Sequence, residues 1–364
     1  MKFVDLQSQF AACETEIRKE IDEVLRTGQF VLGPKGSGLE TALAAYVGAK
    51  HGIGCSSGTD ALLLALMAYG VQAGDEIVTV PFTFVATAEA IALTGAIPVF
   101  VDIDPTTCNI DAARIEEAVT KKTRGILPVS LYGQCAAMEA IGSIAAEYGL
   151  FVVEDGAQSF GAERNGRMSC GFPHMGVTSF FPSKPLGCYG DGGMVFTSDD
   201  ALADRVRGLR NHGQWERYRH RMIGINGRLD EIQAAVLLGK FPRFGDEVKR
   251  RARLGARYSE RLGDVVSVPA IAEGNSHVFA QYTIRTPSRD ELAAHLNGNG
   301  VPTAVHYPIP LHLQEAFQGL GYKTGDFPAS EAAAREVVSL PMSAYLSESD
   351  QDEVIRQVRR FFGK

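Results

Sequence analysis

The chain has 364 residues, which at about 150 residues per domain predicts two domains, or one large α/β unit with an appended lobe. Asp and Glu outnumber Lys and Arg by 43 to 36, a formal net charge of −7, so the composition offers no basic surface for nucleic acid or anionic lipid. The six cysteines are scattered without a C-x-x-C pair, which favours reduced thiols in a cytoplasmic protein.

Strand-like and helix-like segments alternate over the first two-thirds of the chain. Such alternation is typical of βαβ units, so we expect a largely parallel, buried sheet. Helices are predicted at 14–26, 37–47, 60–69, 86–93, 111–119 and 138–148, and strands at 76–80, 97–103, 125–131, 150–154, 177–181 and 193–197.

The pattern changes after about residue 200. We place the domain boundary at residue 245, which gives domains 1–245 and 246–364, although a long helix at the boundary could belong to both. Helices are predicted at 201–209, 229–238, 246–262, 289–297 and 350–361, and strands of a second, small α/β lobe at 278–285 and 338–340.

The sequence shows no targeting or metal-binding pattern. The N-terminus MKFVDLQSQF lacks the apolar core of a signal peptide, and no apolar run approaches the ~18–20 residues of a membrane helix. The histidines form no H-E-x-x-H motif and no zinc-like spacing. We therefore expect no metal, no membrane and no nucleic acid among the partners.

One lysine lies in a setting that is unusual for an exposed ammonium. Lys184 follows the predicted strand 177–181 between apolar and aromatic neighbours, and Gly190-Asp-Gly-Gly193 comes next. Because desolvation lowers the pKa of a lysine, such a side chain can act as a nucleophile. An ordinary loop lysine is the alternative.

Asp155 directly follows the buried strand predicted at 150–154, the position at which open α/β sheets bind their ligands. A buried carboxylate needs a compensating partner, and a protonated pyridine nitrogen is one, as in pyridoxal phosphate sites. A strand-end aspartate that caps the following turn is the alternative.

The segment Cys55-Ser-Ser-Gly-Thr-Asp60 leads directly into a predicted helix. A helix start of this composition can bind phosphate, or Ser57 or Thr59 can simply cap it. The same stretch contains a G-x-S-x-G match, so a serine hydrolase with Ser56, Asp155 and His306 in that order is a competing hypothesis. It leaves Lys184 unexplained.

Several motifs occur together and in one order. They are Gly58-Thr-Asp-Ala-Leu62, Glu154-Asp155-x-Ala-Gln158, Ser179-Phe-x-x-x-Lys184, Gly190-Asp-Gly-Gly193, Gly224-x-Asn226-x-Arg228-Leu229 and Gln233-Ala-Ala235. This set resembles the sugar aminotransferases of the DegT/StrS type over nearly the whole chain. The resemblance implies pyridoxal 5′-phosphate as cofactor and an aspartate aminotransferase-like (fold type I) α/β fold. That fold has a large, mostly parallel seven-stranded sheet domain and a small C-terminal α/β domain.

The resemblance also implies roles for individual residues. Lys184 would bind the cofactor covalently, Asp155 would pair with its ring nitrogen, Gln158 would approach its phenolic oxygen and Phe84 would stack on its ring. Gly58, Thr59, Asp60 and Ser179 would bind its phosphate, and Asn226 would reach the phosphate in the neighbouring subunit of a homodimer with shared active sites. The substrate would contact Gly28, Phe30, Ser183, Arg228, His306 and Tyr307.

Three segments resemble one subgroup, the enzymes that aminate C3 of UDP-2-acetamido-2-deoxy-3-oxo-glucuronate. They are Val129–Cys135, Phe181–Tyr189 and Ala304–Pro310. The resemblance implies L-glutamate and a UDP-keto-sugar as substrates and a place in lipopolysaccharide O-antigen synthesis. A different UDP- or dTDP-keto-sugar, aminated at C3 or C4, is the alternative.

Two positions depart from the wider family, in which position 30 is often Tyr rather than Phe and Asn rather than Pro185 follows the lysine. Sugar dehydratases on the same scaffold carry His in place of Lys184, which argues against that class. A small-molecule-binding regulator is the non-enzymatic alternative, and no segment resembles a DNA-binding arm.

Overall fold

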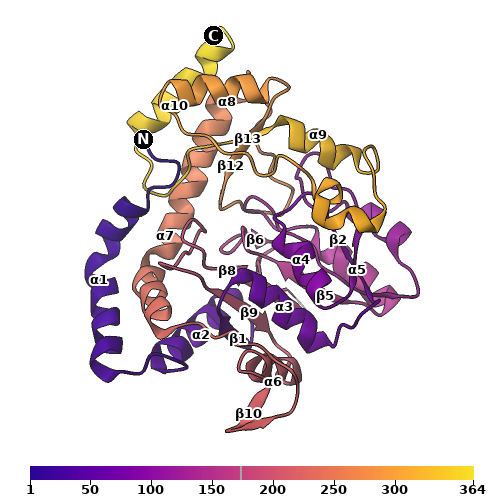
Figure 1. Cartoon of the computed structure of the whole chain (residues 1–364). Helices are drawn as coiled ribbons and strands as arrows, with labels where there is room; N and C mark the ends of the chain where they lie inside the picture. The colour runs from indigo at the N-terminus through magenta and orange to yellow at the C-terminus, as the bar shows by residue number, and fades with distance from the viewer. Residues whose placement is uncertain (173) are drawn as a thin grey trace.

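The computed structural model describes residues 1–172 and 174–364 (Figure 1). Its centre is a seven-stranded sheet in the order β1-β9-β8-β5-β4-β2-β3. Within this sheet β9 runs antiparallel to β1 and β8, and the remaining pairs are parallel, as the sequence predicts. The strands are β1 (His51–Cys55), β2 (Glu76–Thr79), β3 (Ile97–Phe100), β4 (Thr123–Ile126), β5 (Phe151–Asp155), β8 (Met175–Ser179) and β9 (Gly193–Thr197).

Helices cover both faces of the sheet and make a three-layer α/β/α domain. Strand β9 shows the alternation that this requires: Val195 packs into the cluster on one face, whereas Met194 and Phe196 pack into the cluster on the other. The first face carries α3 (Gly58–Tyr69), α4 (Ala86–Leu93) and α6 (Asp200–Leu209), and the second α1 (Leu6–Thr27), α2 (Pro34–Val47), α5 (Met138–Tyr148) and α7 (Glu231–Leu262).

A small C-terminal α/β domain lies above the sheet in Figure 1. The antiparallel strands β12 (Tyr282–Arg285) and β13 (Val337–Leu340) pack with α8 (Arg289–Gly298), α10 (Glu348–Phe361) and the end of α7. Tyr258 of α7 is fully buried in this core. The small lobe that the sequence predicts is therefore present, with its own hydrophobic core.

Helix α7 replaces the two helices predicted at 229–238 and 246–262. It runs for 32 residues with Pro242 inside, and α1 lies along it at the left of Figure 1. An internal proline costs about 3 kcal/mol in an isolated helix, but packing of α7 against α1 and α2 outweighs this. The proposed domain boundary at residue 245 thus falls within one continuous helix.

Other predicted elements differ in extent. Residues 111–119 form two 3₁₀ turns, Ala112–Arg114 and Glu116–Ala118, instead of an α-helix. The strand expected from 278 begins only at Tyr282, because the N–H of Val278 donates to Gly133 O in a neighbouring loop. Helix α9 (Pro328–Glu336) and the hairpins β6–β7 (Glu163–Arg164, Arg167–Met168) and β10–β11 (Gln214–Glu216, Arg219–His220) were not predicted.

Helix α1 begins eight residues before the predicted start at Glu14. The carboxylate of Asp5 caps it by accepting a hydrogen bond from the N–H of Ser8, at 3.1 Å. An aspartate that precedes an apolar residue is a strong N-cap signal. The capping pattern therefore defines the helix start better than the amphipathic periodicity does.

Candidate active site

The candidate site lies at one edge of the central sheet. Carboxyl ends of parallel strands lie on the same edge, and ligands of α/β sheets bind there. Gly58 follows β1, Phe84 follows β2, Asp155 ends β5, and Ser179 ends β8 shortly before Lys184. The topology thus brings together residues from four separate parts of the chain.

Asp155 is buried at the end of β5. Its carboxylate accepts hydrogen bonds from Thr87 Oγ1 at 2.9 Å and from the N–H of Ala157 at 3.1 Å. Burial raises the pKa of Asp155, although these hydrogen bonds and the nearby Lys184 ammonium act in the opposite direction. Both hydrogen-bond donors are neutral, so the carboxylate would be stabilised further by a cation at this edge.

Lys184 lies in the loop that leaves β8. Its backbone N–H donates to Phe181 O at 2.9 Å, which makes the loop turn tightly. Burial lowers the pKa of Lys184, and the charge of Asp155 offsets this only in part. The shift raises the population of the neutral amine, the form that attacks a carbonyl carbon.

The N-terminus of α3 lies against the end of β8. Ser57 caps the helix, since its Oγ accepts a hydrogen bond from the N–H of Asp60 at 3.0 Å. A Cβ on Gly58 would lie 2.6 Å from Cβ of Ser179, so the backbone can approach this closely only without a side chain. Unpaired first-turn N–H groups and the helix dipole make this helix start suited to an anion.

Gln158 is buried and its amide is held from both sides. Its Oε1 accepts a hydrogen bond from the N–H of Tyr132 at 2.8 Å, and its Nε2 donates to Tyr307 Oη at 3.0 Å. The hydroxyl of Tyr132 in turn donates to the carbonyl of His306. This chain of contacts connects the sheet domain with the segment 306–307 that precedes β13.

His306 is largely buried near Lys184. Its Nδ1 lies 2.9 Å from Ser339 Oγ, and Ser339 Oγ lies 2.9 Å from Thr283 Oγ1. Burial, together with the charge of Lys184, lowers the pKa of His306 to about 4. The imidazole is therefore neutral near pH 7. Burial likewise raises the pKa of the neighbouring Tyr307 hydroxyl.

Two aromatic side chains named from the sequence are partly open to solvent. Phe84 is 54% exposed, and its ring centroid lies 6.0 Å from that of Tyr307 at an interplanar angle of 39°. Phe30 is 48% exposed, and its carbonyl accepts a hydrogen bond from the N–H of Glu231 at 3.1 Å. Core packing was the alternative role for both rings, but neither Phe84 nor Phe30 is buried in the hydrophobic core.

The remaining predicted residues lie around this centre. Ser183 directly precedes Lys184, whereas Gly28 ends α1 with a φ of 69°. Asn226 is exposed and its backbone pairs with that of Asn211, to whose Oδ1 Arg228 donates a hydrogen bond at 3.0 Å. Among the described residues, no side-chain hydrogen bond joins Gly28, Phe30, Asn226 or Arg228 to Asp155 or Lys184. The structure thus does not bring these four into the hydrogen-bonded centre.

The sequence did not single out Thr87 or Tyr132, which hold Asp155 and Gln158. Thr87 belongs to the segment 81–87 that follows β2, and its only signal was a hydroxyl in the first turn of a helix beside a strand end. The backbone of Tyr132 has a φ of 59°, a value that residues other than glycine rarely adopt, and Gly133 follows it. A Tyr-Gly pair after an apolar strand was therefore the available signal.

The serine hydrolase hypothesis is wrong. Ser56 Oγ donates to the carboxylate of Asp60, His306 bonds to Ser339, and Asp155 bonds to Thr87. A catalytic triad needs these three groups hydrogen-bonded in series. Instead, each has a different partner, so Ser56, His306 and Asp155 form no triad.

The described part of the chain has neither a metal-ligand cluster nor a membrane-spanning helix. Residues 1–172 and 174–364 contain no group of three or more His, Cys, Asp or Glu side chains placed to hold a metal ion. No helix in those ranges has both the length and the apolar character needed to cross a bilayer.

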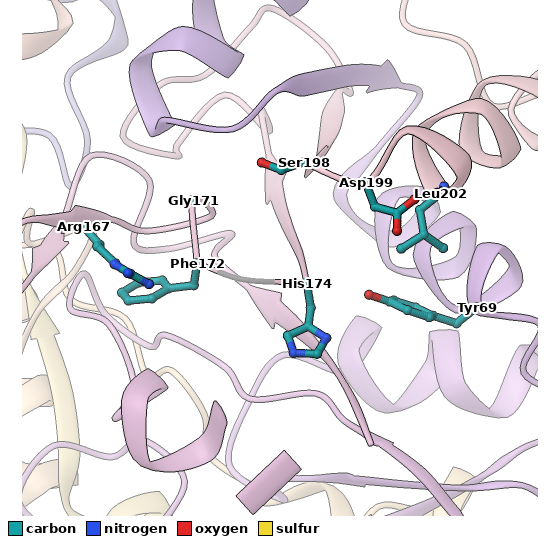
Figure 2. Close-up of a pocket in the computed structure, with 8 residues that line it drawn as sticks. All are labelled: Tyr69, Arg167, Gly171, Phe172, His174, Ser198, Asp199 and Leu202. Carbon is teal, nitrogen blue, oxygen red and sulfur yellow. Dashed lines mark hydrogen bonds between the residues drawn. The ribbon is translucent and has the colours of Figure 1, made fainter. Parts of the chain in front are cut away.

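A separate pocket lies at the opposite end of the strands from Lys184 (Figure 2). Its walls come from residues just before β8 and just after the antiparallel β9, and include His174 and Asp199. Since Lys184 follows the other end of β8, this pocket is not part of the candidate active site.

A partly buried lysine and a buried strand-end carboxylate lie at the carboxyl edge of a mixed seven-stranded α/β sheet, beside a small C-terminal domain, and these are the features of an aminotransferase of fold type I. The chain belongs to the DegT/DnrJ/EryC1/StrS aminotransferase family, whose model matches residues 12–359. Enzymes of this family depend on pyridoxal phosphate.

Three similar proteins illustrate the relationship. The UDP-2-acetamido-2-deoxy-3-oxo-D-glucuronate aminotransferase of Pseudomonas aeruginosa is 50% identical, over 95% of this chain and 96% of that protein. A pleiotropic regulatory protein of Geobacillus stearothermophilus is also 50% identical, over 99% and 98%. The crystal structure of DesV from S. venezuelae in complex with a ketimine intermediate has a TM-score of 0.98 and 39% identity, over 100% and 98%. The chain is thus a pyridoxal phosphate-dependent nucleotide-sugar transaminase.

Proposed function

We propose that the enzyme transfers the amino group of L-glutamate to C3 of UDP-2-acetamido-2-deoxy-3-oxo-glucuronate. The pair of Lys184, partly buried with a lowered pKa, and the buried Asp155 carries the proposal of amino transfer. The 50% identity with the P. aeruginosa aminotransferase supports the choice of sugar. The product would supply a bacterial surface polysaccharide such as lipopolysaccharide O-antigen. Amination at C3 or C4 of another UDP- or dTDP-keto-sugar is the alternative.

The side chains at the sheet edge fit pyridoxal phosphate. The buried Asp155 carboxylate has only neutral donors, so the protonated ring nitrogen would compensate its charge. Gln158 would approach the phenolic oxygen, and the half-exposed ring of Phe84 would stack on the cofactor ring. When bound, the cofactor supplies an electron sink for the carbanion that forms at the donor's Cα.

The phosphate group of the cofactor would bind at the start of α3. Gly58 and Thr59 offer backbone N–H groups there, and Ser179 offers a hydroxyl directly beside Gly58. The N–H of Asp60 already donates to Ser57 Oγ, so a phosphate oxygen would have to share this donor. Asn226 of a second subunit would complete the site.

Lys184 would act both as the covalent attachment point and as the proton carrier. Its lowered pKa favours the neutral amine, which can accept the proton from Cα of L-glutamate. Lys184 would release this proton again before the first half-reaction ends, and in the second half-reaction it would act once more as proton carrier and deliver a proton to C3 of the sugar. The net change is an amino group gained by the sugar and 2-oxoglutarate released, so the reaction needs no external oxidant or reductant.

The sugar nucleotide would lie between this centre and the segments around it. Arg228 would supply a positive charge for the diphosphate or uronate, and neutral His306 and Tyr307 would hydrogen-bond to the sugar. Ser183 lies next to Lys184, and Gly28 and Phe30 lie at the end of α1. Phe30 offers no hydroxyl, so its contact would be stacking or apolar packing.

We further propose a cytoplasmic homodimer with shared active sites and a domain division at residues 1–245 and 246–364. Partly exposed aromatic and aliphatic side chains at Phe30, Val31 and Leu32 support burial against a second subunit. All six cysteines are free and buried, as suits a reducing compartment.

Covalent trapping tests the role of Lys184. The purified enzyme should be yellow, and borohydride should fix the cofactor on the peptide that contains Lys184, as read by mass spectrometry. Lys184→Ala should lose this label and at least about 10²–10⁴-fold in turnover while keeping its circular dichroism spectrum. Retained transamination by Lys184→Ala would contradict the proposal.

A further inference from the structure

We propose that Lys240 is a positioning residue that holds the loop bearing Lys184, through the carbonyl of Gly187 and the ring of Tyr189. The relevance for catalysis rests on the proposed function, in which Lys184 is the reacting lysine. The contacts themselves do not depend on it.

Lys240 lies in the first half of α7 and is only 1% exposed. Its Nζ donates hydrogen bonds to Gly187 O at 2.6 Å and to Gln9 Oε1 at 3.0 Å, and lies 4.0 Å from the ring centroid of Tyr189. These three contacts use the donors and the charge of the ammonium group. Because lysine is rarely fully buried, its position against this loop needs a reason other than packing.

A second residue of α7 holds the same loop. Gln233 Oε1 accepts a hydrogen bond from the N–H of Tyr189 at 2.8 Å, and its Nε2 donates to Tyr189 O at 3.3 Å. Gln233 and Lys240 are seven residues apart, so they lie on one face of the helix. Helix α7 therefore binds the loop at Gly187 and at Tyr189, shortly after Lys184.

A buried polar network holds Gln9, one of the two hydrogen-bond acceptors of Lys240, in place. Gln9 Nε2 donates to Glu247 Oε2 at 2.9 Å, and Tyr345 Oη donates to Glu247 Oε1 at 2.8 Å. The network thus connects α1, α7 and the segment after β13. A narrow cavity lined by Lys184, Gln9, Glu247 and Tyr345 shows that the network adjoins the reacting lysine.

The loop is tight enough to move as a unit. A Cβ on Gly187 would lie 2.5 Å from Pro182 O, and the N–H of Cys188 donates to Phe180 O at 2.8 Å. Together with the bond from the N–H of Lys184 to Phe181 O, these contacts fold the loop back on itself. A displacement of the Gly187 carbonyl would therefore also displace Lys184.

The test compares full-length Lys240→Met and Gln233→Leu with Lys249→Met, which changes an exposed lysine of the same helix that lies 3.8 Å from the carboxylate of Asp246. Hydrogen–deuterium exchange is measured over residues 181–190, with and without pyridoxal phosphate. Lys240→Met should exchange about tenfold faster there, since Gly187 O and Gln9 Oε1 lose their donor. Gln233→Leu should show a smaller increase, and Lys249→Met none.

Three further readouts separate positioning from general stability. In Lys240→Met, borohydride trapping on Lys184 should be slower and kcat should fall, while KM for the keto-sugar and the circular dichroism spectrum stay unchanged. If Lys240→Met does not fold, the exchange rate measured in Gln233→Leu alone tests the proposal. The proposal would be overturned if the variants that fold exchange over residues 181–190 at the same rate as Lys249→Met.

The outcomes also distinguish this inference from the proposed function. If wild-type Lys184 is not trapped by borohydride, the proposed function fails. The exchange rates still test whether Lys240 positions the loop. If Lys184 is trapped but exchange in the variants matches the control, the proposed function holds and the positioning role fails.

Discussion

The pKa values of Asp155 and Lys184 are shifted in opposite directions at one site. Burial raises the pKa of Asp155 and lowers the pKa of Lys184, so desolvation drives both toward their neutral forms. Their mutual attraction offsets these shifts only in part. Both groups are therefore costly in the protein without a cofactor, and pairs of this kind are typical of functional sites.

We therefore expect Asp155→Asn to stabilise the cofactor-free protein near pH 7. The pKa of Asp155 is raised in the folded state, so between its ordinary value near 4 and the folded value the folded state binds more protons and stability falls as pH rises. Above that window the full penalty of the charged carboxylate remains, and Asn removes it.

Thermal unfolding between pH 3.5 and 7.5 measures the effect. The variant should be more stable than wild type at pH 7, and the difference should vanish near pH 3.5. It should also bind pyridoxal phosphate more weakly and lose most of its activity. A cofactor-free variant less stable than wild type at pH 7 would show that Asp155 is not under desolvation strain.

At the scale of elements, the start of α3 and the end of β8 form one unit. The close approach of Gly58 to Ser179 predicts that Gly58→Ala forces Ser179 to shift, because the two Cβ atoms would be only 2.6 Å apart. We expect about tenfold weaker binding of pyridoxal phosphate, equal to the loss of one good hydrogen bond to phosphate.

Gly142→Ala is the matched control for this prediction. Gly142 lies within α5, and a Cβ there meets no atom within 4 Å. Alanine should stabilise that helix by about 0.5–1 kcal/mol and leave cofactor affinity unchanged. Titration of the cofactor's absorbance gives both dissociation constants, and equal values for the two variants would exclude a phosphate site at Gly58.

The elements that the sequence predicted well are those with a strong local signal. The apolar run before Asp155 gave β5 to within a residue at either end, and the Ser57 cap marks the start of α3. Helix α7 appeared as two helices because Pro242 and a change in charge interrupt the pattern. Its continuity comes from packing against α1, which is distant in sequence.

The same distinction applies to the site. Lys184, Asp155 and the glycine-rich helix start could be proposed from the sequence because each carries its own local pattern. The partners of these residues could not, since Thr87 meets Asp155 and Tyr132 meets Gln158 only through the strand order of the sheet. Contacts between residues so far apart in sequence are set by topology, which local periodicity does not encode.

For the whole molecule, the proposed dimer predicts complementation between two inactive variants. Lys184→Ala disables the site of the subunit that carries it. If Asn226 binds phosphate in the neighbouring subunit, Asn226→Asp disables the neighbouring subunit's site instead. Random mixing makes half of the molecules hybrids with one intact site, so about a quarter of wild-type activity should return. Unfolded and refolded mixtures measure this, and absence of recovery would place Asn226 in its own subunit's site.

The sugar that this enzyme aminates can be identified by a single comparison of nucleotide-sugar substrates. The enzyme is incubated with L-glutamate and a panel of UDP- and dTDP-linked keto-sugars, and the mass of each nucleotide-sugar product is determined. We predict the aminated product with UDP-2-acetamido-2-deoxy-3-oxo-glucuronate, together with stoichiometric 2-oxoglutarate. Preferred amination of a dTDP-linked or a 4-keto sugar would contradict the proposed substrate.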